Sequence, residues 1–327
     1  MESPDALPRD DDLPGDLMEF ARRFSDEDAC EEVLRRWRYG DQTFRCPACG
    51  HTKAWYLATR RLDECCGCGR QTSLTAGTVF HGTRRPLSKW FFAMFLFVSS
   101  KQGVSALELA RQIGVSYPTA WTWLHKLRSA LGLRSMQLLH GLVEVDETYE
   151  GGVEHGKTGR GSVAKALIGG AVEIARDDRG YGRARLRVIP DASAATLKSL
   201  LQQTVEPGAS VLTDGWHGYS TQATEGFTHY AVDVATSGKE AHEVLPGVHR
   251  VFSLMHRVLL ATHQGAVSKK HLQRYLDEFA FRFNRRRSAS RGLLFQRLLS
   301  AAVMARPPAY WEILGRQDAR TPLRRVA

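Results

Sequence analysis

Four cysteines in two short pairs constrain this chain more than any other feature of its sequence. Cys46 and Cys49 form one C-x-x-C unit, and Cys65 and Cys68 form a second one sixteen positions after Cys49. Each C-x-x-C turn can present two thiolates at one point, and two such turns complete the tetrahedral Cys₄ site that Zn²⁺ prefers. The spacing predicts a small ribbon over residues 41–82 that is held by a structural Zn²⁺.

Two cysteines fall outside this pattern. Cys66 is the spare residue of the second pair, and Cys30 is too far away in the sequence to be a preferred ligand. Buried structural cysteines or a redox pair remain the alternative interpretation. Five cysteines clustered in a long chain favour a metal over disulfides.

A second pattern follows over residues 86–137, where the periodicity is helical and a Gly-Val-Ser break stands at 114–116. Gly114 is suited to the turn, and Leu107, Ala110 and Ile113 are expected on the buried face of the first helix. This order is typical of a helix-turn-helix, whose second helix contacts DNA. An ordinary helical hairpin is the alternative. The residues predicted to face the DNA are Tyr117, Thr119, Thr122, His125 and Lys126.

Charge and hydropathy agree with a nucleic-acid partner. The formal net charge is +10, and the sequence pI is about 9.5. A cationic surface favours polyanions, with DNA ahead of an anionic membrane. The longest apolar run, Trp90 to Val98, is too short to cross a bilayer, which takes about 18 residues or more. The acidic N-terminus lacks a secretory signal core, so we expect a cytoplasmic protein.

From Leu142 the pattern changes to short strands, at 142–150, 166–175, 184–190, 210–215 and 229–234, with one helix over 195–205. From Leu245 the pattern again predicts helices. We therefore expect a multidomain α/β protein. Its segments are an N-terminal helical lead (1–40), the ribbon (41–82), the helix-turn-helix region (86–137), a mixed-sheet domain (140–290) and a C-terminal helical tail (291–327).

Carboxylates mark two of these strands. Glu144 and Asp146 share one face of the first strand, because side chains alternate along a strand. Acidic residues on an otherwise apolar strand are unusual unless they hold a cation. Asp214 ends the fourth strand at a Gly-containing turn, although an Asp there can also be a plain turn residue. Together Asp146 and Asp214 could bind a pair of Mg²⁺ or Mn²⁺ ions that cleave a phosphodiester.

These motifs resemble the ISXO2-like zinc-ribbon DDE transposases of bacterial insertion sequences. The resemblance runs from about Phe20 to Asn284 through CPAC, CCGCGRQTSLTAGTVFHGT, PLSKWFFAMF, VEVDETYEGG, LTDGWHGYS and THQGAVSKKHLQRYLDEFAFRFNRR. It implies an RNase H-like catalytic domain with strands 1 to 3 antiparallel. It also implies DNA transposition by end cleavage and strand transfer. The partners implied are the terminal inverted repeats, the target DNA and further copies of the chain assembled on that DNA.

In this resemblance Asp146 and Asp214 match the first two acids of the family. The third position aligns with His249, where relatives carry Glu or Asn, and Glu243 or Glu240 remains the alternative third acid. His256 stands where relatives place Lys and could contact a phosphate. His249, Ser253 and His256 share one helical face. The arginines that follow Phe281 could also track a DNA backbone.

Two other functions stay open at this point. The substitutions at His249 and His256 are compatible with a decayed or domesticated transposase that acts as a DNA-binding regulator. An RNase H-like nuclease or resolvase, which would cleave without strand transfer, is the third hypothesis.

Overall fold

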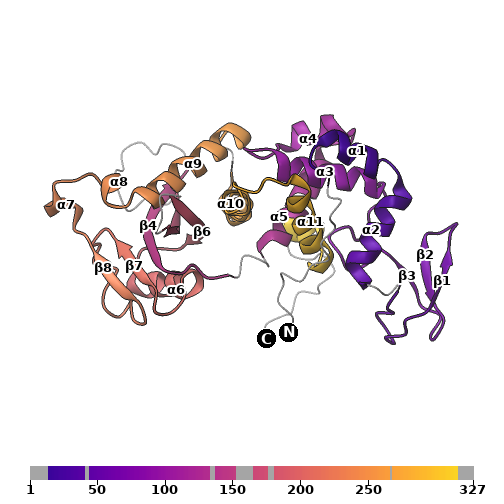
Figure 1. Ribbon diagram of the computed structural model, residues 1–327, viewed down its shortest axis with the longest axis horizontal. Coiled ribbons are helices and arrows are strands. Elements are labelled where there is room, and N and C mark those ends of the chain that lie inside the picture. The colour runs from indigo at the N-terminus through magenta and orange to yellow at the C-terminus, as the bar shows by residue number, and fades with distance from the viewer. Residues whose placement is uncertain are drawn as a thin grey trace, which may run out of the picture. The chain divides into compact units, whose positions relative to one another are not determined.

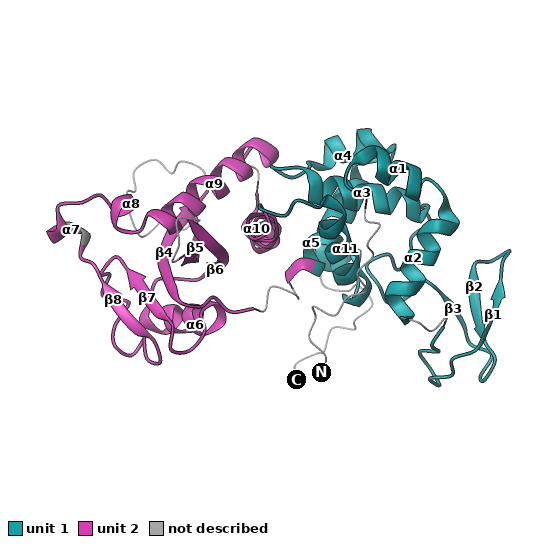
Figure 2. Cartoon of the chain, in the orientation of Figure 1, with its two compact units in different colours: residues 1–130, 287–327 teal, residues 131–286 magenta. Residues whose placement is uncertain are grey.

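The computed structural model describes residues 14–40, 44–132, 137–151, 165–175, 180–265 and 267–315. Its contacts divide the chain into two compact units (Figure 2). Unit 1 combines residues 1–130 with 287–327, and unit 2 comprises residues 131–286. Parts of the predicted lead (1–40) and of the predicted tail (291–327) lie outside the described residues.

Unit 1 contains a small antiparallel sheet where the ribbon was predicted. Its strands lie in the order β1-β2-β3 (Figure 1). They are β1 (Ala54–Leu57), β2 (Leu62–Cys65) and β3 (Gln71–Ser73). The register pairs Ala54 with Cys65, so the second cysteine pair begins where β2 ends.

The rest of unit 1 is helical. Its helices are α1 (Leu17–Phe24), α2 (Glu27–Tyr39), α3 (Leu87–Ser99), α4 (Ala106–Ile113), α5 (Tyr117–Gly132, which ends in unit 2), α11 (Arg291–Met304) and α12 (Tyr310–Leu314). Aromatic rings form its core, with the Phe20 centroid 4.3 Å from that of Phe95 and 4.9 Å from that of Phe295. Since Phe295 belongs to α11, the predicted C-terminal tail supplies part of this core.

Unit 2 is built on a five-stranded mixed sheet of order β6-β5-β4-β7-β8. The strands are β4 (Leu142–Glu150), β5 (Ala166–Ile174), β6 (Tyr181–Ile189), β7 (Ser210–Thr213) and β8 (Thr228–Ala231). β4, β5 and β6 are antiparallel neighbours, whereas β7 runs parallel to both β4 and β8. The antiparallel first three strands agree with the RNase H-like core that the resemblance implied.

Helices cover both faces of this sheet. The helices that follow β6 in unit 2 are α6 (Ala194–Thr204), α7 (Val234–Ser237), α8 (Ala241–Val244), α9 (Pro246–His263) and α10 (Lys269–Phe283), and the coverage comes from α6, α9 and α10. α9 and α10 pack on one face with Ile168 and Leu186, and α6 packs on the other with Val143 and Val145. A Cβ on Gly170 would lie 2.5 Å from the Phe252 ring, so this glycine lets α9 approach the sheet closely.

In the described part of the chain, no helix is both long enough and apolar enough to cross a membrane. The chain between the first two strands of unit 2 is rich in Gly, Lys and Arg, and its residues 152–164 lie outside the described ones.

Candidate active site and zinc centre

The four predicted zinc ligands come together at the end of the ribbon. One ligand atom from each of Cys46, Cys49, Cys65 and Cys68 lies within 4.8 Å of all the others. The closest sulfur pairs are Cys46 with Cys68 at 3.6 Å and Cys49 with Cys65 at 3.5 Å. A tetrahedron with Zn–S bonds of about 2.3 Å separates its sulfurs by about 3.8 Å. The cluster therefore fits a structural Zn²⁺.

The two knuckles are built alike. Gly50 N donates to Cys46 O at 3.0 Å, and Gly69 N donates to Cys65 O at 2.9 Å. Both glycines have positive φ, 74° and 69°, a conformation that favours glycine. Cys66 is exposed and Cys30 is buried in α2, and neither joins the four-sulfur group.

The parallel pairing of β4 with β7 brings the two predicted aspartates together. Its register pairs Val143 with Val211 and Glu144 with Leu212. Asp146 and Asp214 each follow the last paired residues by two positions, and the charges of both act on His249 and on Tyr219. Alternation along β4 directs the Asp146 side chain to the face covered by α9, whereas Asp214 begins the turn after β7, where its carboxylate accepts from the Trp216 N–H at 3.1 Å. Asp146 is buried and Asp214 is half-buried.

His249 reaches this pair from the first turn of α9. Its Nε2 lies 3.2 Å from an Asp146 carboxylate oxygen. The contact with Asp146 raises the pKa of the imidazole, partial burial opposes the shift, and the negative charges of Glu144 and Asp214 add to it. The structure thus places the three predicted catalytic residues in one electrostatic environment.

Glu144 was recognised in the sequence only as a neighbour of Asp146. It is 3% exposed, and its Oε2 accepts a hydrogen bond of 2.9 Å from the Val248 N–H. α9 has no side-chain cap from its own N-cap residue, Leu245, so the carboxylate from β4 takes that place. A Cβ on Gly247 would lie 3.0 Å from the same oxygen. Glu144 therefore anchors the first turn of α9, which carries His249. Burial raises the pKa of Glu144, and the amides of Val248 and Gly247 oppose that rise.

Tyr219 supports the strand from the opposite face. Its buried hydroxyl donates a short hydrogen bond to Glu147, the residue after Asp146. Burial raises the pKa of Tyr219 well above its ordinary value, and the charge of Glu147 raises it further. Tyr219 thus stays a neutral donor that fixes β4 beside the turn after Asp214.

The other candidates for the third acid point elsewhere. Glu240 and Glu243 are exposed and form a capping box at the start of α8, where Glu243 accepts from the Glu240 N–H at 2.8 Å. His256 lies two turns after His249, with its Nε2 3.3 Å from a Glu150 carboxylate oxygen. Position thus favours His249 over both glutamates.

The donor set suits a hard divalent cation. Two carboxylates supply the oxygen ligands that Mg²⁺ and Mn²⁺ prefer, and a histidine can complete the set. Among the described residues, the four cysteines alone have three or more ligand atoms within 4.8 Å of one another. The aspartates and His249 are therefore wider apart as a group than the zinc ligands are.

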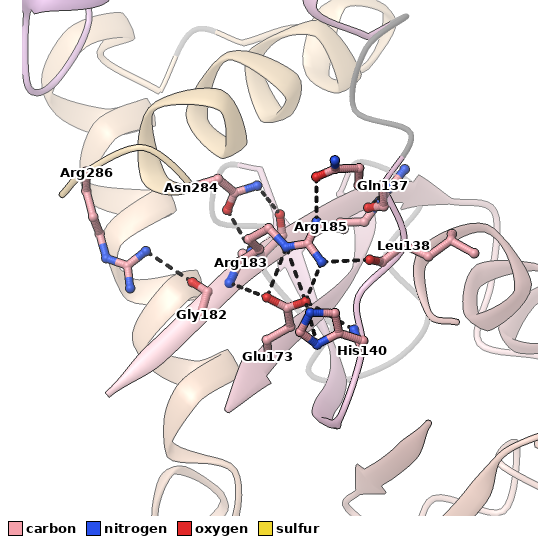
Figure 3. A network of polar contacts seen from close by, with 10 residues as sticks. Gln137, Leu138, His140, Glu173, Gly182, Arg183, Arg185, Asn284 and Arg286 are labelled. Atoms are coloured by element: carbon pink, nitrogen blue, oxygen red, sulfur yellow. Dashed lines mark hydrogen bonds and ion pairs between the residues drawn. The ribbon is translucent and has the colours of Figure 1, made fainter. Parts of the chain in front are cut away.

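A polar network fixes the segment that leads into β4 (Figure 3). Glu173 accepts from the Arg183 guanidinium at 2.7 Å and from the His140 N–H at 3.1 Å. Arg183 also donates to the Leu138 carbonyl at 2.8 Å. These contacts hold residues 138–140 against the ends of β5 and β6, just before the strand that carries Asp146.

The arginine-rich segment at the end of α10 forms hydrogen bonds to the edge strand β6. Asn284 accepts from the Ala184 N–H at 2.7 Å and donates to the Ala184 carbonyl at 3.0 Å, as a neighbouring strand would. Arg286 donates to the Gly182 carbonyl at 3.1 Å, as Figure 3 shows. Arg282 pairs with Glu278. Arg282 and Arg286 therefore serve the protein itself, whereas Arg287 is exposed, and a contact of that residue with DNA stays a prediction.

The residues of α5 that were predicted to face DNA differ in their exposure to solvent. Tyr117 is 53% exposed, and Thr119 and Thr122 are half-buried. The prediction was wrong for His125, which is fully buried, because the inward face of α5 includes it beside Trp123 and Leu124.

Two further details of the helix pair differ from expectation. Lys126 is half-buried, and its ammonium lies 3.4 Å from the His81 carbonyl; burial lowers its pKa. In α4 the buried face contains Leu109 and Ala110, whereas Leu107 is 49% exposed. The turn itself follows the prediction, since Gly114 caps α4 in the left-handed conformation.

Known proteins share both domains of the chain. Residues 138–284 match the family model of the ISXO2-like transposase domain, and residues 25–71 match the transposase zinc-ribbon domain. An uncharacterized protein in transposable element ISH50 of Halobacterium salinarum is 28% identical over 271 residues. That alignment covers 76% of this chain and 86% of the relative. An uncharacterized transposase-like protein of Haemophilus influenzae is 25% identical over 117 residues, which are 36% of this chain and 94% of the relative.

Among solved structures, the Mos1 transposase paired-end complex with left transposon end aligns over 64% of this chain and 80% of that chain. The TM-score is 0.24 and the identity 14%, too low to establish a common fold. The two domain matches together span more than half of the chain. The chain therefore belongs to the ISXO2-like DDE transposases that carry a zinc ribbon.

Proposed function

We propose that this chain is an active transposase that cleaves the ends of its insertion sequence and joins them to target DNA. The observation that carries this proposal is the Asp146–His249 contact of 3.2 Å, and the β4–β7 register, which ends two residues before Asp146 and Asp214, supports the inclusion of Asp214. The hydrolysis of each end and the strand transfer that follows would both take place at this point.

In this proposal Asp146, Asp214 and His249 hold Mg²⁺ or Mn²⁺. The bound ions would supply activation of the attacking oxygen and stabilisation of the leaving oxygen. Other residues of the chain hold these ligands in position. Glu144 fixes the turn that carries His249, and Tyr219 fixes β4 through Glu147. His256 is proposed to contact a phosphate of the DNA beside the site.

We also propose that α4 and α5 form a helix-turn-helix that contacts DNA through Tyr117, Thr119 and Thr122. Lys126 contributes charge from a half-buried position. The partners are the terminal inverted repeats and the target, and copies of the chain assemble on that DNA because two ends must be joined. A protein with these partners would work in the cytoplasm, at the nucleoid.

Asp146→Asn tests the catalytic assignment. Wild-type protein with Mg²⁺ should release and join a labelled fragment that carries both element ends, whereas the variant should bind the fragment normally and form no cleaved or joined product. The change keeps the size of the side chain and removes a ligand charge. Cleavage by Asp146→Asn at the wild-type rate would contradict the proposal. Cleavage without joining by the wild type would favour a nuclease or resolvase.

One observation favours a second function, a DNA-binding regulator without catalysis. The resemblance aligns His249 with the third acid of the family, and its Nε2 lies 3.2 Å from an Asp146 carboxylate oxygen. A carboxylate at this position would repel Asp146 unless a metal ion lay between them, whereas a histidine can pair with Asp146 directly. If His249 is a metal ligand, Mn²⁺ should support more activity than Mg²⁺, and His249→Glu should keep or raise the activity with Mg²⁺. Normal rates in His249→Ala would exclude it as a ligand. Specific DNA binding without products under any metal would favour the regulator.

A further inference from the structure

A cationic cleft lies within unit 1, between the ribbon and the start of α3. Its volume is about 670 Å³, and its walls come from the first turns of α2, the β1–β2 turn, the end of β3 and the segment that leads into α3. Four arginines line it: Arg60, Arg61, Arg84 and Arg85. All four are exposed.

The acids of the cleft are already engaged. The Glu27 carboxylate accepts from the N–H groups at the start of α3, from Leu87 at 2.6 Å and from Ser88 at 3.0 Å. Glu31 pairs with Arg61 at 2.6 Å. These contacts neutralise one arginine of the four and leave the other three without a carboxylate partner from the cleft.

The remaining arginines are available to an anion from outside. Arg60 donates to the neutral amide of Gln71 at 2.9 Å. Arg84 and Arg85 make no ion pair within residues 14–40 or 44–132 of unit 1. The turn that presents them is ordered, because Thr83 Oγ1 accepts from the Trp90 indole at 2.9 Å and from the Arg85 N–H at 3.2 Å.

The chemistry of the lining is that of a phosphodiester site. Hydroxyls stand among the arginines, on Ser73, Thr75, Thr83 and Ser88. Arginine guanidinium groups and Ser or Thr hydroxyls are frequent donors to DNA phosphates. The segments that form the cleft, residues 26–40 and 44–85, carry ten Lys and Arg against seven Asp and Glu, so their net charge is positive as well.

The helix α5 offers fewer free donors than this cleft. His125 is buried, and the ammonium of Lys126 lies against the His81 carbonyl. The Thr122 hydroxyl donates to the Pro118 carbonyl at 2.7 Å. A backbone contact therefore has stronger candidates in the cleft than on the helix expected to supply it.

We propose that this cleft binds the sugar-phosphate backbone of duplex DNA, with Arg84 and Arg85 each neutralising one phosphate. The inference rests on the proposed function, since it assigns the DNA that the transposase holds to a particular surface. The proposed contacts are to phosphates, which position the duplex and carry no sequence information of their own.

The test uses the full-length zinc-loaded protein and a fluorescent duplex that carries the element's terminal repeat, with a scrambled duplex beside it. Arg84→Ala/Arg85→Ala is compared with Arg22→Ala/Arg306→Ala, which removes the same charge from exposed positions of unit 1 outside the cleft. Affinity is measured by fluorescence anisotropy from 50 to 250 mM KCl, roughly the range over which phosphate contacts are resolved. Circular dichroism and zinc content check that each variant is folded.

Each phosphate contact contributes about 0.9 to the slope of log affinity against log salt, or about eightfold in affinity at 0.1 M salt. The cleft variant should therefore bind both duplexes about sixty-fold more weakly at 0.1 M salt, with a slope lower by about 1.8. Arg84→Lys/Arg85→Lys should keep most of the slope. The control variant should stay within about threefold of wild type.

Two results would overturn the proposal, and they differ. A cleft variant with the affinity and slope of the control variant would contradict the cleft alone, and wild-type end cleavage would still support the transposase. A wild-type protein that binds neither duplex would contradict the proposed function and the cleft with it.

Discussion

Replacing Glu144 tests whether a strand carboxylate holds α9, and with it His249, in place. Glu144→Ala removes the acceptor of the Val248 N–H in a place where both residues are buried. An unsatisfied buried N–H costs about 1–3 kcal/mol. Loss of the negative charge at a partly buried helix N-terminus costs up to about 2 kcal/mol. We expect unit 2 to lose about 3 kcal/mol of its free energy of unfolding.

Glu144→Gln separates the two contributions. An amide oxygen can still accept from the Val248 N–H, so only the charge is lost, and the expected cost is about 1 kcal/mol. The matched control is Glu150→Ala, which removes a carboxylate from the same face of the same strand. Glu150 contacts His256 on α9 at 3.3 Å but accepts no helix N–H, so its loss should cost less than about 1 kcal/mol.

Urea unfolding followed by circular dichroism gives these free energies, and hydrogen–deuterium exchange reports on the helix itself. Peptides that cover residues 246–256 should exchange faster in Glu144→Ala than in Glu150→Ala, because the first turn of α9 opens. A Glu144→Ala protein within about 0.5 kcal/mol of wild type, with unchanged exchange in these peptides, would refute the anchoring role.

Three more outcomes follow from the same geometry. Chelation of zinc, or Cys49→Ser, should unfold the ribbon while unit 2 keeps its circular dichroism signal, because the four sulfurs close that small sheet; melting of both units together would contradict this. Burial alone would raise the pKa of Glu173, but hydrogen bonds from Arg183 outweigh it and lower that pKa. The stability they give is present above the unfolded value and is lost as pH falls through the folded pKa. Glu173→Gln should therefore be less stable than wild type by about 1–3 kcal/mol at pH 7, with a gap that closes in acid; a gap independent of pH in urea titrations would count against it. Gly170→Ala should lose about 1–3 kcal/mol by overpacking, because the new Cβ would lie 2.5 Å from the Phe252 ring; equal urea midpoints would show that the helix can shift at no cost.

Features that depend on nearby residues could be predicted from the sequence. Each cysteine pair sits within four residues, so turn geometry alone places Cys46 and Cys49, and the distance between the pairs predicts one site. The strand period likewise put Glu144 and Asp146 on one face, and the structure agrees.

Long-range contacts could not be read in the same way. The partner of Glu144 lies 104 positions later in the chain, on a helix whose start has no capping residue of its own. Asn284 satisfies the edge strand at Ala184 across 100 positions. Such pairings depend on the strand order of the sheet, which no spacing in the sequence reveals.

The faces of α5 show a limit of periodicity. Tyr117, Thr119, Thr122, His125 and Lys126 were grouped as polar and therefore exposed, yet His125 lies on the buried side. An amphipathic side chain such as histidine can be placed inside when tertiary packing favours it. Polarity alone therefore could not separate Tyr117 from His125.

The central claim is that Asp146 and Asp214 bind divalent ions at a shared site. Electron paramagnetic resonance of Mn²⁺ titrated into the protein bound to its terminal DNA measures this directly. Wild type should bind Mn²⁺ in the micromolar to millimolar range, and Asp146→Asn and Asp214→Asn should each weaken the same site by about tenfold or more. Unchanged Mn²⁺ binding in both variants would contradict the claim.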